Sequence, residues 1–152
     1  MDEIVARSLA KWPTVPAVYG WLSLDRRGNW LIKGEKIGNA ALREFIGRNY
    51  EPDARGCWFF QNGPQRVYVR LAYTPLIVHF EGEALKDHCG RPFRADQVLL
   101  DDAGSVVIAG EGTVALLDDR DLARFADEGA KLEPVSALEV PKRYRYSLDP
   151  AP

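Results

Sequence analysis

The feature that most constrains how this chain can fold is a twelve-residue stretch that occurs twice. Residues 24–35 read LDRRGNWLIKGE and residues 100–111 read LDDAGSVVIAGE, so six of the twelve positions are identical. In both copies an Asp precedes a Gly by three positions, between apolar residues. Asp commonly opens a tight turn, and Gly supplies the positive φ that closes it. Each copy is therefore predicted to form a β-hairpin.

A short helix is predicted after each hairpin. Residues 40–49 carry apolar side chains at helical spacing, and Asn39 is suited to cap the N-terminus of that helix. Residues 118–129 begin with acidic residues, which favour the start of a helix, and Gly129 is suited to end it. The apolar stripes consist of Leu42, Phe45 and Ile46 in the first helix and of Leu122, Phe125 and Ala126 in the second. The shared order of hairpin, glycine link and helix favours an internal duplication.

The rest of the chain is predicted to consist mostly of strands and turns. A helix over residues 2–11 leads into an extended, proline-rich arm with Trp12 as its expected anchor. Residues 72–75 are predicted to close a hairpin in which Leu71 faces Leu76. The other predicted elements are strands over residues 57–61, 66–71, 76–81, 113–117 and 133–141 and a helical turn over residues 84–88.

The sequence thus predicts an α+β fold of mainly antiparallel β-hairpins with two short helices, arranged as two related half-domains. At 152 residues, the chain is long enough to bury a core of its own. The expected segments are a helix and arm over residues 1–18, a first half over residues 19–82, a second, smaller half over residues 83–140, and a flexible tail over residues 141–152.

The predicted hairpin over residues 66–81 carries the best candidate for a binding site. In its expected register, one face places Arg66 opposite Glu81 and Tyr68 opposite His79. Guanidinium groups hold carboxylates and phosphates through paired hydrogen bonds. The candidate ligand-binding residues are Arg66, Tyr68, Arg70 and His79. The alternative is an ordinary solvated sheet face on which Arg66 pairs with Glu81.

No pattern in the sequence predicts catalytic residues, a metal site or a cofactor. The sequence contains neither a Gly-x-Ser-x-Gly nucleophile motif nor a phosphate-binding glycine loop. His88 and Cys89 are adjacent, but we interpret them as part of a polar loop rather than as a base and a nucleophile. Neither these two residues with His79 nor the acidic run 118–121 shows the spacing of metal ligands.

Composition and charge restrict the partners that this chain is expected to have. The formal net charge of −2 argues against general affinity for nucleic acid. The apolar runs are too short to span a bilayer and the N-terminus has no signal-peptide core, so the expected location is the cytoplasm, where both cysteines should be free thiols. Aromatic residues on the predicted strands leave open either a packed core or a homodimer surface.

Several short motifs of the first half occur in an order that resembles a known family. These motifs are residues 25–30, Gly34 with Ile37, residues 41–45, 56–60 and 63–67, and Thr74 with Pro75. In them the chain resembles the uncharacterised bacterial family called domain of unknown function 1285, or a shorter relative of it. The resemblance covers residues 19–81 well and residues 97–125 loosely. It implies two related α+β half-domains, and it brings no established activity from which catalytic residues could be transferred.

The leading functional hypothesis is therefore a cytoplasmic binding or protein-interaction module, for which a regulatory role is one option. The alternative is a small enzyme, or a protein that binds an anionic metabolite, through Arg66, Tyr68, Arg70 and His79. A concave pocket with perturbed titrating groups at that face would favour an enzyme, whereas a flat face would favour an interaction module.

Overall fold

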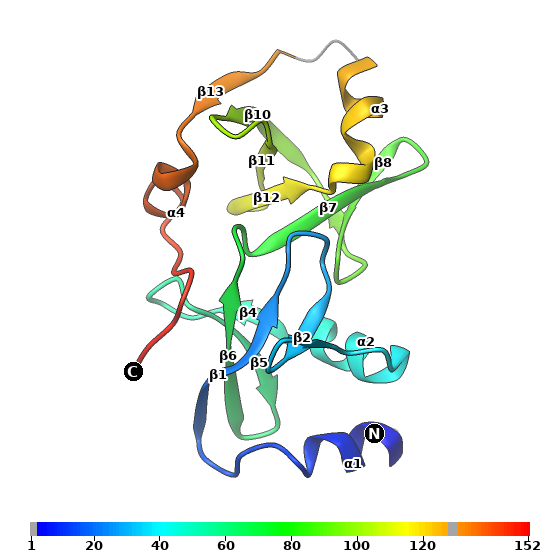
Figure 1. Ribbon diagram of the computed structural model, residues 1–152, viewed down its shortest axis with the longest axis vertical. Helices are drawn as coiled ribbons and strands as arrows, with labels where there is room; N and C mark the ends of the chain where they lie inside the picture. The colour runs from blue at the N-terminus through cyan, green and yellow to red at the C-terminus, as the bar shows by residue number, and fades with distance from the viewer. Residues whose placement is uncertain (1–2, 128–130) are drawn as a thin grey trace.

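The computed structural model describes residues 3–127 and 131–152 and contains two β-sheets, one from each half of the chain (Figure 1). The strands of the first sheet are β1 (Ala17–Leu24), β2 (Trp30–Ile32), β3 (Glu35–Lys36), β4 (Tyr50–Pro52), β5 (Trp58–Asn62) and β6 (Gln65–Leu71). They lie in the order β3-β2-β1-β6-β5-β4. Two antiparallel three-stranded units meet in the middle of this sheet, where β1 and β6 run parallel.

The second sheet repeats this arrangement. Its strands are β7 (Leu76–Glu81), β8 (Ala84–Asp87), β9 (Pro92–Phe93), β10 (Ala95–Asp101), β11 (Val106–Gly110), β12 (Thr113–Leu117) and β13 (Glu133–Val135). They lie in the order β13-β10-β11-β12-β7-β8-β9. Again two antiparallel three-stranded units meet at a parallel pair, here β7 and β12, while β13 adds a parallel edge strand beside β10.

The common strand order confirms the predicted α+β fold with two related half-domains. The two sheets are joined by residues 72–75, so the boundary between the halves falls there rather than at residue 82. The two repeated hairpins form β1-β2 and β10-β11 as expected. They are not equivalent in the shared strand order, in which β1-β2 corresponds to β7-β8 and β10-β11 to β4-β5, so the predicted duplication of hairpin, glycine link and helix is wrong although the two sheets are related.

The predicted hairpin between residues 66–71 and 76–81 is wrong, because β6 and β7 belong to different sheets. Both strands bury three consecutive residues, 67–69 in β6 and 76–78 in β7. Consecutive burial is typical of a central strand that is covered on both faces and paired on both edges. Between them Thr74 is buried, with its Oγ1 donating to the carbonyl of Leu76 and accepting from the amide of Leu116 in β12. These bonds direct β7 towards β12.

The repeated Asp and Gly residues form one kind of turn, and four such turns occur within residues 3–127 and 131–152. Their first and last residues are Asp25 and Gly28, Asp53 and Gly56, Asp87 and Gly90, and Asp101 and Gly104. In each, Oδ1 of the Asp accepts the amides two and four residues later, and the Gly has φ between 79° and 85°. The turn that begins at Asp87 follows a strand, so the helical turn predicted over residues 84–88 is wrong.

The predicted helices are present. Helix α2 (Ala40–Arg48) begins at the predicted cap, where the Asn39 side chain accepts the Leu42 amide at 2.9 Å. Helix α1 (Glu3–Leu9) ends shortly before Trp12, which is buried as expected. After β12 come the 3₁₀ turn η1 (Asp119–Asp121) and α3 (Leu122–Asp127), of which Phe125 is buried. Gly129 and the side chain of Ala126 lie outside the described residues.

The segment predicted to be a flexible tail returns to the first half and packs there (Figure 1). After β13, the 3₁₀ turn η2 (Ala137–Glu139) and α4 (Val140–Arg143) lead into the returning segment, residues 144–151. Ser147 donates its amide to the carbonyl of Gly56, and the carbonyl of Leu148 accepts the amide of Leu71 at 2.8 Å. Tyr146 is buried. The prediction failed because these partners are distant in the sequence.

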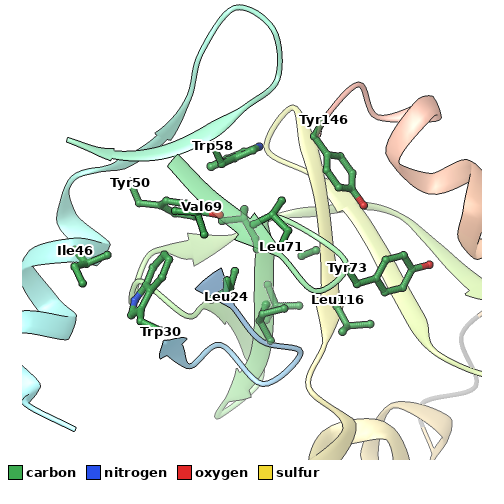
Figure 2. Close-up of a cluster of buried hydrophobic side chains, with 14 of the residues drawn as sticks. Leu24, Trp30, Ile46, Tyr50, Trp58, Val69, Leu71, Tyr73, Leu116 and Tyr146 are labelled. Carbon is green, nitrogen blue, oxygen red and sulfur yellow. The ribbon is translucent and has the colours of Figure 1, made fainter. Parts of the chain in front are cut away.

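One continuous hydrophobic core runs through both halves. In Figure 2, Trp30 and Tyr50 of the first half lie near Val69 and Leu24, while Tyr146 of the returning segment and Tyr73 of the linker cover the other end of the cluster. No helix among the described residues is both long and apolar enough to cross a membrane.

Candidate functional site

The structure separates the four predicted ligand-binding residues. Arg66, Tyr68 and Arg70 lie on β6 in the first sheet, whereas His79 lies on β7 in the second sheet. The predicted pairings of Tyr68 with His79 and of Arg66 with Glu81 are therefore wrong. Glu81 instead accepts from Lys86 at 3.4 Å and lies 3.9 Å from Nε2 of His79.

The three residues on β6 are each engaged with other parts of the chain. Tyr68 is buried, stacks on Tyr19 with ring centroids 4.8 Å apart, and donates its hydroxyl to Asp53. The guanidinium of Arg66 lies 4.3 Å from the centroid of the Phe59 ring. Arg70 donates to the carboxylate of Asp149 in the returning segment at 3.2 Å. The carboxylate-binding chemistry expected of this face is thus met by the chain itself at Arg70.

A concave region lies elsewhere, between the two halves, and consists of two adjoining hollows of about 410 and 470 Å³. We call this region the inter-half cleft. Both hollows are lined by Gly28 from the β1-β2 turn and by His88 from the β8-β9 turn. The first hollow continues along α2, past Arg43 and Glu44. The second continues towards His79 and the start of η1.

The wall of the second hollow is built from paired charges. Arg27 donates two hydrogen bonds to Asp119, at 3.0 and 3.1 Å, and so connects the halves across the cleft. Arg120 holds the carboxylate of Asp118 through two further bonds, at 2.9 and 2.6 Å. Burial alone would raise the pKa of Asp118, but the hydrogen bonds from Arg120 outweigh it and lower that pKa.

The floor of the cleft is formed by His88. Although the residue is partly exposed, its ring nitrogen Nε2 is buried, and the ring lies near Trp30 and Tyr50, with centroids 5.1 and 5.6 Å away. The amide of Ile77 donates to Nδ1 at 3.2 Å. Burial lowers the pKa of His88 to about 3, so the ring is neutral and carries its proton on Nε2. That N–H group has no acceptor among the described residues.

Two neighbours fix the shape of this floor. A Cβ added to Gly28 would lie 2.7 Å from Cβ of His88, so the turn can approach the histidine only because residue 28 is glycine. Cys89 lies against Gly47 of α2, and burial, with a further contribution from Asp87, raises the pKa of its thiol to about 12. Cys89 is therefore a protonated thiol at neutral pH rather than a nucleophile.

Sequence reasoning noticed His88 and Cys89 but did not place them in a cleft. The signal that could have done so is the third Asp-x-x-Gly pattern, Asp87 to Gly90, which encloses both residues. This pattern predicts a tight turn, and the two central residues of such a turn, here His88 and Cys89, can contact neighbouring elements. Only the tertiary structure shows that α2 and the turn at Gly28 do so.

The fold defines a class of two-sheet α+β proteins whose known structures include members of the DUF1285 family. A DUF1285 family protein from Silicibacter pomeroyi DSS-3 is similar with a TM-score of 0.58 and 17% sequence identity, over 84% of each chain. Another from Shewanella baltica OS155 has a TM-score of 0.54 and 18% identity, over 71% of this chain and 91% of that one. These likenesses confirm the predicted resemblance at the level of the fold.

The sequence itself belongs to a family of proteins of unknown function. A family model named DUF2944, with the description "Protein of unknown function (DUF2946)", matches residues 1–151. The chain is therefore a member of that family. Among curated proteins, none matches the sequence significantly.

Proposed function

We propose that this protein is a binding module that holds a small polar ligand with an anionic group in the inter-half cleft. The observation that carries the proposal is the cleft itself, whose hollows of about 410 and 470 Å³ have the size of small-molecule sites and are walled by both halves. We also propose that the protein acts in the cytoplasm.

The chemistry of the floor supports binding rather than catalysis. The two side chains that would serve as base and nucleophile, His88 and Cys89, are both held in their neutral forms by burial. A catalytic pair needs pKa values near the working pH, and both shifts lead away from it. The buried Nε2–H of His88 is suited to a structural hydrogen bond, such as one to an ordered water beneath a ligand.

The lining carries the acids Glu44, Asp118 and Asp121 beside three arginines. We base the preference for an anionic group on the arginines, because Asp118 and Asp121 already accept hydrogen bonds from Arg120 and from the Phe80 amide. Arg43 on α2 lines the first hollow, and its side chain has no charged or hydrogen-bonded partner among the described residues. Arg27 and Arg120 line the second hollow and keep 52% and 63% of their side chains exposed, although each is paired with an Asp. These donors can add a ligand carboxylate or phosphate to their existing bonds.

Replacing Arg43 by alanine is expected to weaken ligand binding about tenfold to a hundredfold, because a hydrogen bond to a charged group contributes roughly 1.5–3 kcal/mol. Binding is measured by ¹H–¹⁵N NMR titration with inorganic phosphate, a dicarboxylic acid, an α-amino acid and a nucleoside monophosphate. The reporters are the backbone amides of Gly28, Cys89 and Gly90, which line the cleft.

The matched control for this experiment is Arg48→Ala. Arg48 lies on the same helix, and its guanidinium is 6.0 Å from the centroid of the Phe45 ring rather than at the first hollow. Unchanged binding by this variant supports the proposal. Equal weakening by both variants, or the absence of shifts at the three amides with millimolar probe, would refute it.

A further inference from the structure

We propose a second site, on the first half and separate from the inter-half cleft, that takes a free medium-chain carboxylic acid. The site is a groove of about 450 Å³ between the end of α1, the β2-β3 hairpin and the start of α2. We call it the arm groove, because residues 10–16 lead from α1 past it. The side chains that give it an apolar lining are Trp12, Trp21, Ile32, Ile37 and Leu42.

The apolar lining is recessed. Trp12, Ile37 and Leu42 are at most 9% exposed, so none of these three side chains protrudes from the surface. A protein that inserts into a lipid surface instead needs protruding apolar side chains. The recessed lining therefore favours a single acyl chain in solution as the occupant, while Ile4 of α1 and Val15 of the arm are exposed apolar side chains that make a bilayer the alternative to test.

Trp21 is the central aromatic residue of the groove. The ring centroids of Trp21 and Trp12 are 6.4 Å apart, and the ammonium group of Lys33 lies 4.3 Å from the Trp21 centroid. The indole N–H of Trp21 is buried and has no acceptor among the described residues. A buried donor without an acceptor is unfavourable, so a small displacement of this ring that brought its N–H group to the carboxylate of an occupant would be favourable.

The charges around the groove favour an anion. Two of its polar side chains are already used within the chain, since Ser8 donates to the carbonyl of Ile4 and Asn39 caps α2. The charged side chains that remain are those of Lys11, Lys36 and Glu35, so cations outnumber the acid. An apolar body with one carboxylate matches this combination of lining and rim.

The test is a ¹H–¹⁵N NMR titration of the whole chain with hexanoate, octanoate and decanoate below their critical micelle concentrations. The four tryptophan indole N–H signals are the reporters, of which Trp12 and Trp21 line the groove while Trp30 and Trp58 lie in the core of the first half. Saturable shifts confined to the Trp12 and Trp21 signals are expected. Each added CH₂ should strengthen binding about fourfold, as the burial of a methylene group predicts.

Three variants establish the charge of the occupant. Lys36→Gln is expected to weaken decanoate binding several-fold, and Glu35→Gln is expected to strengthen it by a similar factor. Lys142→Gln removes an exposed lysine from α4 in the second half and should leave binding unchanged. All three substitutions are at exposed positions, so each variant should fold normally.

Several outcomes would overturn the proposal. Shifts of all four indole signals together would indicate non-specific, detergent-like binding. Equal affinity for decanol and decanoate, or equal effects of the three variants, would show that the carboxylate does not contribute to binding. Binding to vesicles of anionic phospholipid without binding to free decanoate would make the groove a membrane contact instead.

Discussion

Replacing Gly56 by alanine is expected to lower the free energy of unfolding by about 3 kcal/mol or more, a larger loss than turn strain alone would cause. Gly56 has φ +79°, and a Cβ at this position would lie 2.0 Å from the carbonyl oxygen of Arg145. The methyl group therefore requires both a strained turn and displacement of the returning segment, which would remove Tyr146 from its buried position. Urea unfolding measures the loss.

Gly104→Ala is the matched control, because Gly104 closes the same kind of turn with φ +85° and has nothing within 4 Å of an added Cβ. This variant should lose only the strain of the left-handed conformation, about 1–2 kcal/mol. Trypsin cleavage after Arg145 gives a second readout, which should be faster in Gly56→Ala and unchanged in the control. Equal losses of stability and equal cleavage in the two variants would show that the returning segment does not depend on Gly56.

The second large effect concerns pH. Burial, together with the nearby charge of Arg91 and partly offset by Asp25, gives His88 a pKa of about 3 in the folded protein, below its ordinary value of 6.5. Between these two values the unfolded chain binds a proton that the folded chain does not, so the free energy of unfolding falls as the pH falls. Linkage predicts a loss of about 2 kcal/mol between pH 7 and pH 5 from this residue alone.

His88→Asn removes the titrating ring while its side-chain oxygen can still accept the Ile77 amide. Its overall stability is expected to be lower, because the contacts with Trp30 and Tyr50 are lost, but its loss between pH 7 and pH 5 should be about 2 kcal/mol smaller than that of the wild type. His79→Asn, which alters the other histidine, should retain the wild-type pH dependence. The same pH dependence in all three proteins would rule out His88 as its source.

Local signals in the sequence were sufficient to predict the elements that are stabilised by contacts between residues close in the sequence. The Asp-x-x-Gly patterns at residues 25–28 and 101–104 specify turns because the Asp side chain accepts amides within four residues. Asn39 specifies the start of α2 for the same reason, through a bond to a residue three positions later. These features need no knowledge of the rest of the chain, so the hairpins and helix α2 were predictable.

The choice of neighbouring strands was not predictable, because it is decided by partners distant in the sequence. Residues 72–75 have a length that suits a hairpin, yet Thr74 bonds to Leu116 and directs β7 into the second sheet. Because β7 joins the second sheet, Arg66, Tyr68 and Arg70 lie on a different sheet from His79, and the four residues do not share the predicted face. The inter-half cleft arises only once both sheets pack together, since its lining comes from turns and helices of both halves.

The parallel pairs at the centres of the two sheets have a consequence for how the chain folds. Each pair joins the first and the last strand of a six-stranded unit, β1 with β6 and β7 with β12, so each sheet is completed by a long-range closure. Closures of this kind lose more chain entropy than hairpins and slow folding. During synthesis the first unit can close before the second exists, but its surface near Gly56 stays uncovered until Tyr146 has emerged. The partly synthesised chain is therefore the species most prone to aggregate and to bind chaperones.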